Sequence, residues 1–226
     1  MLPSRLRRSL THHPTELDVQ FFPDERISDA GSFANAYFQQ LAAAAATVES
    51  SAVEAAARLI ESRSRDDKMI FSCGNGGSAA IANHLICDCL KGVRTGSTLH
   101  PRVHSLSASI ETITAVGNDI GYDDIFVYQL ESLSKPGDVL IAISSSGESP
   151  NIVKALTRAR EMDVATIAMT GFSGGAAASI AGISLHVQGQ NYGIVEDIHQ
   201  SLMHILAQHL RYMHLEDESA LGRIKF

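Results

Sequence analysis

Apolar residues follow two alternating patterns along this chain: short continuous runs, and longer segments in which apolar positions recur every three or four residues. The continuous runs predict buried strands, and they cover residues 68–73, 103–106, 139–143, 164–169 and 183–187. The periodic segments between them predict helices near residues 78–90, 110–116, 123–133, 150–162 and 194–213. Strands that alternate with helices form a parallel sheet with helices on both faces. The pattern therefore predicts a three-layer, doubly wound α/β fold with about five parallel strands.

The segment before the first predicted strand divides near residue 30. Residues 1–30 contain three prolines and no helical or strand period, so we expect an N-terminal arm, or a disordered tail, ahead of a single domain over residues 31–226. Residues 32–62 have helical spacing around a run of alanines at 42–46, which predicts one long helix. Its small side chains allow another helix to approach closely. Two partners stay open for it: a helix of a sister subunit, or the chain's own domain.

Composition narrows the classes of function. The chain has 226 residues, 45% of them apolar, which suits one domain with a sizeable core. Its formal net charge of -7 argues against a general nucleic-acid binder, which needs a basic face. No apolar run is long enough to span a bilayer, so we expect no membrane association.

The cysteines indicate a reducing compartment. Cys73, Cys87 and Cys89 are odd in number and two of them are separated by one residue, so a disulfide framework is not expected. We therefore expect a cytoplasmic protein. The spacing of Cys87 and Cys89 is narrower than that of structural zinc pairs, and we interpret both as buried packing residues.

Two loops rich in glycine and serine follow predicted strands and precede predicted helices. Residues 74–78 have the sequence GNGGS, and residues 144–149 have the sequence SSSGES. Glycines let a backbone approach a ligand closely, and the helix N-terminus that follows offers unpaired N–H groups to an anion. Read alone, each loop could be a turn, with Ser78 and Ser149 as helix caps. Two such loops at corresponding strand ends favour a phosphate site, although neither is a nucleotide-binding fingerprint.

Four motifs in register carry a family resemblance. Residues 73–84 (CGNGGSAAIANH), 115–126 (AVGNDIGYDDIF), 137–152 (GDVLIAISSSGESPNI) and 199–206 (HQSLMHIL) together resemble the bacterial phosphoheptose isomerases of the sugar isomerase (SIS) superfamily. The similarity covers roughly residues 33–215. It implies a flavodoxin-like sheet, a homotetramer with active sites between subunits, and interconversion of sedoheptulose 7-phosphate and a heptose 7-phosphate. The substrate-binding residues that it implies are Asn75, Gly76, Gly77, Ser78, Asn118, Asp119, Ser144, Ser145, Ser146 and Ser149.

The resemblance also implies a catalytic metal centre. Aldose–ketose isomerisation needs an acid and a base, and a divalent metal can polarise the carbonyl. His84 and Asp88 lie four residues apart on a predicted helix and so share a face. By resemblance, they bind one Zn²⁺ per subunit together with Glu196 and His204, while Asp88 and His204 are the catalytic base and acid. The family has glutamate in place of Asp88 and glutamine in place of Glu196.

Several alternatives to this ligand set stay open. Eight helical residues separate Glu196 from His204, which leaves their side chains about 80° apart. Asp197 is closer in phase and is the second candidate. Taken singly, His84 is more typical of a capping or core histidine and His204 of a core residue, whereas His199 suggests an interface or supporting role.

Two departures concern the sugar end of the pocket. Ser109 and Gly193 stand where the family has acidic residues, with Glu111 as a candidate replacement.

Two functions follow. The first is a zinc-dependent phosphosugar isomerase. The second is a non-catalytic SIS module, similar to the DnaA initiator-associating protein, that binds a sugar phosphate or a protein partner. Retention of His204 and of a carboxylate at Asp88 favours the enzyme, whereas the shorter carboxylate and the missing acidic residues favour the binder. We favour the enzyme.

Overall fold

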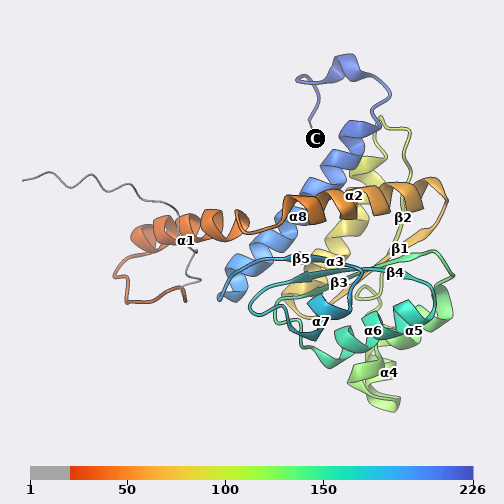
Figure 1. The fold of residues 1–226 in the computed structure, drawn as a ribbon, viewed down its shortest axis with the longest axis horizontal. Coiled ribbons are helices and arrows are strands. Elements are labelled where there is room, and N and C mark those ends of the chain that lie inside the picture. The colour runs from red at the N-terminus through yellow and green to blue at the C-terminus, as the bar shows by residue number, and fades with distance from the viewer. Residues whose placement is uncertain (1–20, 226) are drawn as a thin grey trace, which may run out of the picture.

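The computed structural model describes residues 21–225, so the first part of the predicted N-terminal arm lies outside the described residues. Its centre is a five-stranded parallel sheet in the order β2-β1-β3-β4-β5 (Figure 1). The strands are β1 (Met69–Gly74), β2 (Arg102–Ser105), β3 (Val139–Ser144), β4 (Ala165–Thr170) and β5 (Ile183–His186). The predicted parallel α/β fold is confirmed, and every strand boundary lies within about one residue of the prediction because buried strands are continuous apolar runs.

Helices cover both faces of the sheet (Figure 1). On one face lie α2 (Ser50–Arg65), α3 (Gly77–Cys87) and α8 (Tyr192–Met213), and on the other lie α4 (Ile110–Asp119), α5 (Val127–Leu133), α6 (Pro150–Glu161) and α7 (Gly175–Ile180). Strand β3 shows the alternation that this requires. Ile141 and Ile143 point into the core under α2, α3 and α8, whereas Leu140 and Ala142 point into the opposite core.

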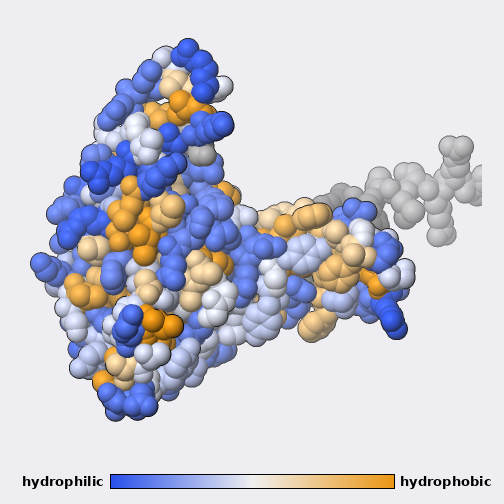
Figure 2. Space-filling model, turned by 180° about the vertical axis from the view of Figure 1, so that it is seen from behind, coloured by the Kyte–Doolittle hydropathy of each residue, from blue (hydrophilic) through white to orange (hydrophobic). Residues whose placement is uncertain are grey.

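The predicted long helix over residues 32–62 is wrong: the chain forms α1 (Ala30–Ala45) and α2, with a break between them. The Thr47 hydroxyl explains the break. It donates to the Ala44 carbonyl at 2.6 Å and accepts from the Gln188 amide, which ties the turn to the chain beyond β5. As a result α1 projects from the body of the molecule (Figure 1). Figure 2 shows apolar surface on this projection, where Phe33 and Phe38 are exposed.

Three helical details differ from the predictions. The helix expected over residues 78–90 is α-helical only as far as Cys87, where α3 ends. The chain then continues as a π-helix, η1 (Asp88–Val93). The helix expected over residues 123–133 divides into a short 3₁₀ turn, η2 (Tyr122–Asp124), and α5. Helix α7 and a 3₁₀ turn, η3 (Glu218–Ala220), were not predicted, because both are shorter than two helical repeats. None of the helices within residues 21–225 is long and apolar enough to cross a membrane.

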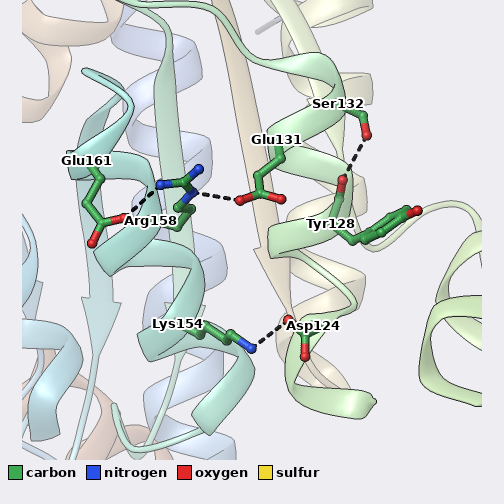
Figure 3. Close-up of polar contacts among 7 residues, drawn as sticks. All are labelled: Asp124, Tyr128, Glu131, Ser132, Lys154, Arg158 and Glu161. Carbon is green, nitrogen blue, oxygen red and sulfur yellow. Dashed lines mark hydrogen bonds and ion pairs between the residues drawn. The ribbon is translucent and has the colours of Figure 1, made fainter. Parts of the chain in front are cut away.

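Exposed ion pairs connect η2 and α5 to α6 (Figure 3). Lys154 pairs with Asp124 at 2.6 Å, and Arg158 pairs with Glu131 at 2.7 Å and Glu161 at 2.9 Å. Exposed pairs contribute little stability individually. Their role here is to position a turn. The Lys154–Asp124 pair anchors η2, which holds Tyr122 over the loop after β1.

Candidate active site

The two predicted loops lie side by side at one edge of the sheet. Strands β1 and β3 are hydrogen-bonded neighbours with Gly74 opposite Ile143, so the segments that follow them meet. This is the point where the strand order reverses, which is where open α/β sheets bind ligands. A pocket of about 160 Å³ opens between the loops. It is lined by Asn75, Ser78, Ile143, Ser144, Ser145, Ser146, Ser149, Tyr192 and Glu196.

Glycine is required at one point of each loop. A Cβ on Gly74 would collide with the Ser78 carbonyl, while Gly77 packs closely against the Glu196 carboxylate across the pocket. Gly147 has a φ of 68°, and a Cβ there would collide with the Gly174 carbonyl. Residues 170–174 thus back the serine loop from behind and lead directly into α7.

The serine hydroxyls of the second loop face the pocket. Ser144 lies 3.4 Å from Ser149, hydroxyl to hydroxyl, and the buried Ser145 hydroxyl has no hydrogen-bond partner among the described residues. Ser149 occupies the N-cap position of α6, but its side chain caps no backbone amide. The prediction of Ser78 as a cap is wrong, because Gly76 holds that position and Ser78 lies inside α3. Ser144 and Ser146 accept hydrogen bonds from the Gly147 and Glu148 amides, whereas the Ser145 hydroxyl and the N-terminus of α6 are left to a ligand, as an anion site requires.

An amide pair ties the two loops together. Asn75 donates to the Asn151 side-chain oxygen at 2.9 Å, and Asn151 donates back to Asn75 at 3.0 Å. The Tyr122 hydroxyl donates to the same Asn75 oxygen at 3.1 Å. Asn151 is only 1% exposed. Asn75, predicted as a sugar contact, is thus held by two residues that the sequence did not single out.

His84, Asp88 and His204 form the second half of the site. Spacing by four residues brings His84 Nε2 to 3.1 Å from Asp88 Oδ1, and His204 Nε2 reaches His84 Nε2 at 3.2 Å and Asp88 Oδ2 at 3.8 Å. Their ligand atoms lie within 4.8 Å of one another. Asp88 Oδ2 is buried and has no hydrogen-bond partner within residues 21–225. Two imidazoles and a carboxylate suit a divalent transition metal such as Zn²⁺, and the unpartnered oxygen is a free ligand atom for it.

Neither of the predicted fourth ligands joins this group. The Glu196 carboxylate lies against Gly77 at the pocket, and burial together with the Asp197 charge raises the pKa of Glu196 above its usual range. Asp197 accepts a 2.6 Å hydrogen bond from the Tyr37 hydroxyl. Burial and this bond raise the pKa of Tyr37.

The residue beside His204 is Gln200, one turn earlier on α8, with its Nε2 at 3.0 Å from His204 Nε2. Sequence reasoning missed Gln200, although its spacing of four residues was the available signal.

The remaining candidates lie away from the pocket or in the core. Asn118 and Asp119 end α4, where the amide of one donates to the carboxylate of the other at 2.7 Å, and their substrate role stays a prediction. Ser109, in place of a family acid, caps α4. His199 is fully buried, and burial lowers its pKa to about 4, so the interface role suggested for it is wrong.

Two of the three cysteines are core residues. Cys73 and Cys89 are buried, as expected for Cys89, and burial followed by the nearby Asp88 charge raises the pKa of Cys89 to about 12. Cys87 is exposed, so its interpretation as a packing residue is wrong. A step of two residues on α3 and η1 turns the side chains to opposite sides of the helix.

Comparisons with known proteins agree with this geometry. Residues 34–171 match the family described as the SIS domain. A phosphoheptose isomerase of Nitratidesulfovibrio vulgaris is 36% identical over 197 residues, which cover 87% of this chain and 90% of that protein.

Two solved structures are similar throughout most of the chain. The phosphoheptose isomerase from Neisseria gonorrhoeae superposes with a TM-score of 0.74 at 30% identity, covering 80% of this chain and 98% of that one. The phosphoheptose isomerase from Francisella tularensis gives a TM-score of 0.76 at 30% identity, with coverage of 81% and 99%.

Proposed function

The chain belongs to the SIS domain family and its relatives are phosphoheptose isomerases; from this premise we propose that it interconverts sedoheptulose 7-phosphate and a heptose 7-phosphate. One observation carries the proposal. Helices α3 and α8 align a phosphate-sized pocket, at Ser78 and Glu196, with an acid–base cluster further along the same two helices, at His84 and His204.

The separation of these two halves suits a seven-carbon sugar. Ser78 and His84 are six residues apart on α3, a rise of about 9 Å. An extended heptulose 7-phosphate has roughly seven bonds between phosphorus and C2, and at about 1.2 Å per bond it spans about 8–9 Å. A phosphate held by the two loops therefore presents C1 and C2 to His84, Asp88 and His204. A pentulose 5-phosphate, shorter by two carbons, falls about 2.5 Å short of the cluster.

The chemistry is a proton transfer between neighbouring carbons. The Asp88 carboxylate removes a proton from C1 while protonated His204 donates one to the carbonyl oxygen at C2, which gives the enediol. Neutral His204 then takes the proton from the C1 hydroxyl, and the Asp88 carboxyl returns its proton to C2. The bonds balance without any co-reactant, and both residues end as they began.

The three residues also suit one zinc ion per subunit. When bound, such an ion polarises the carbonyl and stabilises negative charge on the substrate oxygens. His84, which has no proton-transfer step in this scheme, and the unpartnered Oδ2 of Asp88 would hold the ion. His204 would join them only in its neutral form, because an imidazolium has no free nitrogen for a metal.

Exposed apolar surface supports the subunit association that the family resemblance implies, a homotetramer with active sites between subunits. Phe38 on α1 and Ile205 on α8 are exposed, and a largely apolar pocket of about 350 Å³ lies between α1, α2 and α8. Apolar patches of this kind mark protein interfaces. The free cysteines suit a reducing compartment.

The experiment is an NMR assay of the purified full chain with sedoheptulose 7-phosphate, with and without zinc. We expect an aldose phosphate to accumulate to equilibrium, and shorter ketose phosphates to react more slowly. Binding of the sugar phosphate without any turnover at full metal occupancy would establish the non-catalytic SIS module instead.

A further inference from the structure

The phosphate pocket has no basic side chain among the described residues that line it. Its lining consists of serines, an asparagine, an isoleucine, Tyr192 and Glu196, so the one charged side chain is the Glu196 carboxylate. A phosphate held there is therefore bound by neutral donors, which are hydroxyls, amides and helix N-termini. Each neutral donor that reaches the pocket then contributes directly to affinity.

Tyr192 adds a donor of this kind. It is the first residue of α8, one helical turn before Glu196, so both side chains lie on the face of the helix that lines the pocket. The Tyr122 hydroxyl donates to Asn75, whereas the Tyr192 hydroxyl has no hydrogen-bond partner within residues 21–225. Tyr192 is 62% exposed, so a ligand in the pocket can reach its hydroxyl.

Phe172 holds the Tyr192 ring in place. The two ring centroids lie 4.7 Å apart with their planes inclined by 60°, an arrangement that is favourable for aromatic pairs. Phe172 has a φ of 49°, in the left-handed region that a bulky side chain rarely occupies. Its amide donates to the Gly189 carbonyl at 3.0 Å, and the Gly171 amide donates to the Ser145 carbonyl at 2.8 Å. The serine loop and the segment that leads into α8 therefore hold this unfavourable backbone between them.

We propose that Tyr192 is a substrate-binding residue whose hydroxyl donates to the phosphate, and that Phe172 is its positioning residue. The inference rests on the phosphate pocket of the proposed function and adds to it a donor from α8 rather than from the two loops. It also explains the backbone at residue 172. Strain of this kind persists at binding sites where the surrounding structure fixes it, and a glycine would relieve it only by losing the ring that supports Tyr192.

The test is calorimetric titration of the full chain with inorganic phosphate, together with the KM and kcat for sedoheptulose 7-phosphate. Tyr192→Phe removes only the hydroxyl. Tyr128→Phe is the matched control, because Tyr128 is an exposed tyrosine on α5 that does not line the pocket. A hydrogen bond to a charged group predicts that Tyr192→Phe weakens phosphate binding by about tenfold or more. We expect KM to rise by a similar factor while kcat changes little, and Tyr128→Phe to match the wild type.

Two variants at Phe172 separate positioning from stability. Phe172→Ala and Phe172→Gly both remove the ring, but glycine tolerates the positive φ, so the glycine variant should be the more stable of the two in urea. If Phe172 acts through Tyr192, both variants weaken phosphate binding by the same factor, and neither weakens it further when combined with Tyr192→Phe. Binding that follows stability instead, and is tighter in the glycine variant, would contradict the positioning role.

The outcomes also separate this inference from the proposed function. Wild-type phosphate affinity in Tyr192→Phe would overturn the binding role, whether or not the chain turns over the sugar. Phosphate binding that depends on Tyr192, in a protein without isomerase activity, would support the inference and contradict only the proposed reaction. Absence of phosphate binding by the wild-type chain would overturn the pocket and the inference together.

Discussion

The amide pair between Asn75 and Asn151 gives the sharpest test of how the phosphate pocket is built. Asn151→Ala removes both hydrogen bonds that join the loop after β1 to the first turn of α6. A protein hydrogen bond contributes about 1 kcal/mol net, and a buried polar group left unpaired costs about 1–3 kcal/mol. Because Asn151 is buried, we expect the free energy of unfolding to fall by about 2–4 kcal/mol.

A double-mutant cycle isolates the pair itself. Asn75→Ala, Asn151→Ala and the double variant are unfolded in urea at one fixed protein concentration, because subunit association would otherwise change the apparent stability. Two mutual hydrogen bonds predict a coupling free energy of about 1–2 kcal/mol. Tyr122→Phe is the control, since it removes a third bond to Asn75 from an exposed side chain and should cost less than about 1 kcal/mol.

The same variants test the link to the ligand. If the pair holds the two loops in register, Asn151→Ala raises the KM for the sugar phosphate and weakens inorganic phosphate binding by a similar factor, while kcat changes less. A coupling free energy below about 0.3 kcal/mol, or phosphate binding equal to the wild type, would refute the reasoning.

Three further predictions concern single side chains. Asp88→Asn removes the proposed base and should lower kcat at least about 100-fold, measured by NMR turnover, whereas Asp123→Asn on the η2 turn should leave kcat unchanged. Gly77→Ala puts a Cβ against the Glu196 carboxylate and should weaken phosphate binding, measured by calorimetry. The double variant with Glu196→Ala should recover part of the lost affinity. A double variant that binds phosphate no better than Gly77→Ala would contradict the contact. Burial and Asp197 raise the pKa of Glu196 in the folded protein, so its contribution to stability is complete at low pH and is lost as pH rises through that pKa. Urea unfolding should therefore find Glu196→Gln more stable than the wild type at pH 7, with the difference vanishing near pH 4; a difference that is independent of pH would contradict this.

The sheet could be predicted from the sequence because its signal is local. Each strand is a continuous apolar run, as in residues 139–143, and the loops after β1 and β3 carry their own glycines and serines. Parallel strands bring their carboxyl ends to one edge, so the meeting of the two loops followed from the order of elements alone.

Other features depend on partners far away in the chain. The break between α1 and α2 is held by the contact of Thr47 with Gln188, and no local pattern over residues 32–62 contains it. The Asn75–Asn151 pair likewise joins residues 76 positions apart.

The choice of side chain at the cluster depends on the rotation of α8 relative to α3. The resemblance selected Glu196, at a helical phase about 80° from His204, whereas the packed helices bring Gln200 to the cluster.

The central claim is that Asp88 and His204 move a proton between C1 and C2 of a sugar held by its phosphate. The most direct measurement is NMR of sedoheptulose 7-phosphate with the zinc-loaded chain in D₂O. We predict conversion to a heptose 7-phosphate, with solvent deuterium at C2 in the fraction of turnovers in which the Asp88 carboxyl exchanges its proton before returning it. Conversion should be lost in both Asp88→Asn and His204→Ala while phosphate binding is retained. No conversion by the zinc-loaded wild type, or conversion unchanged in His204→Ala, would contradict the account.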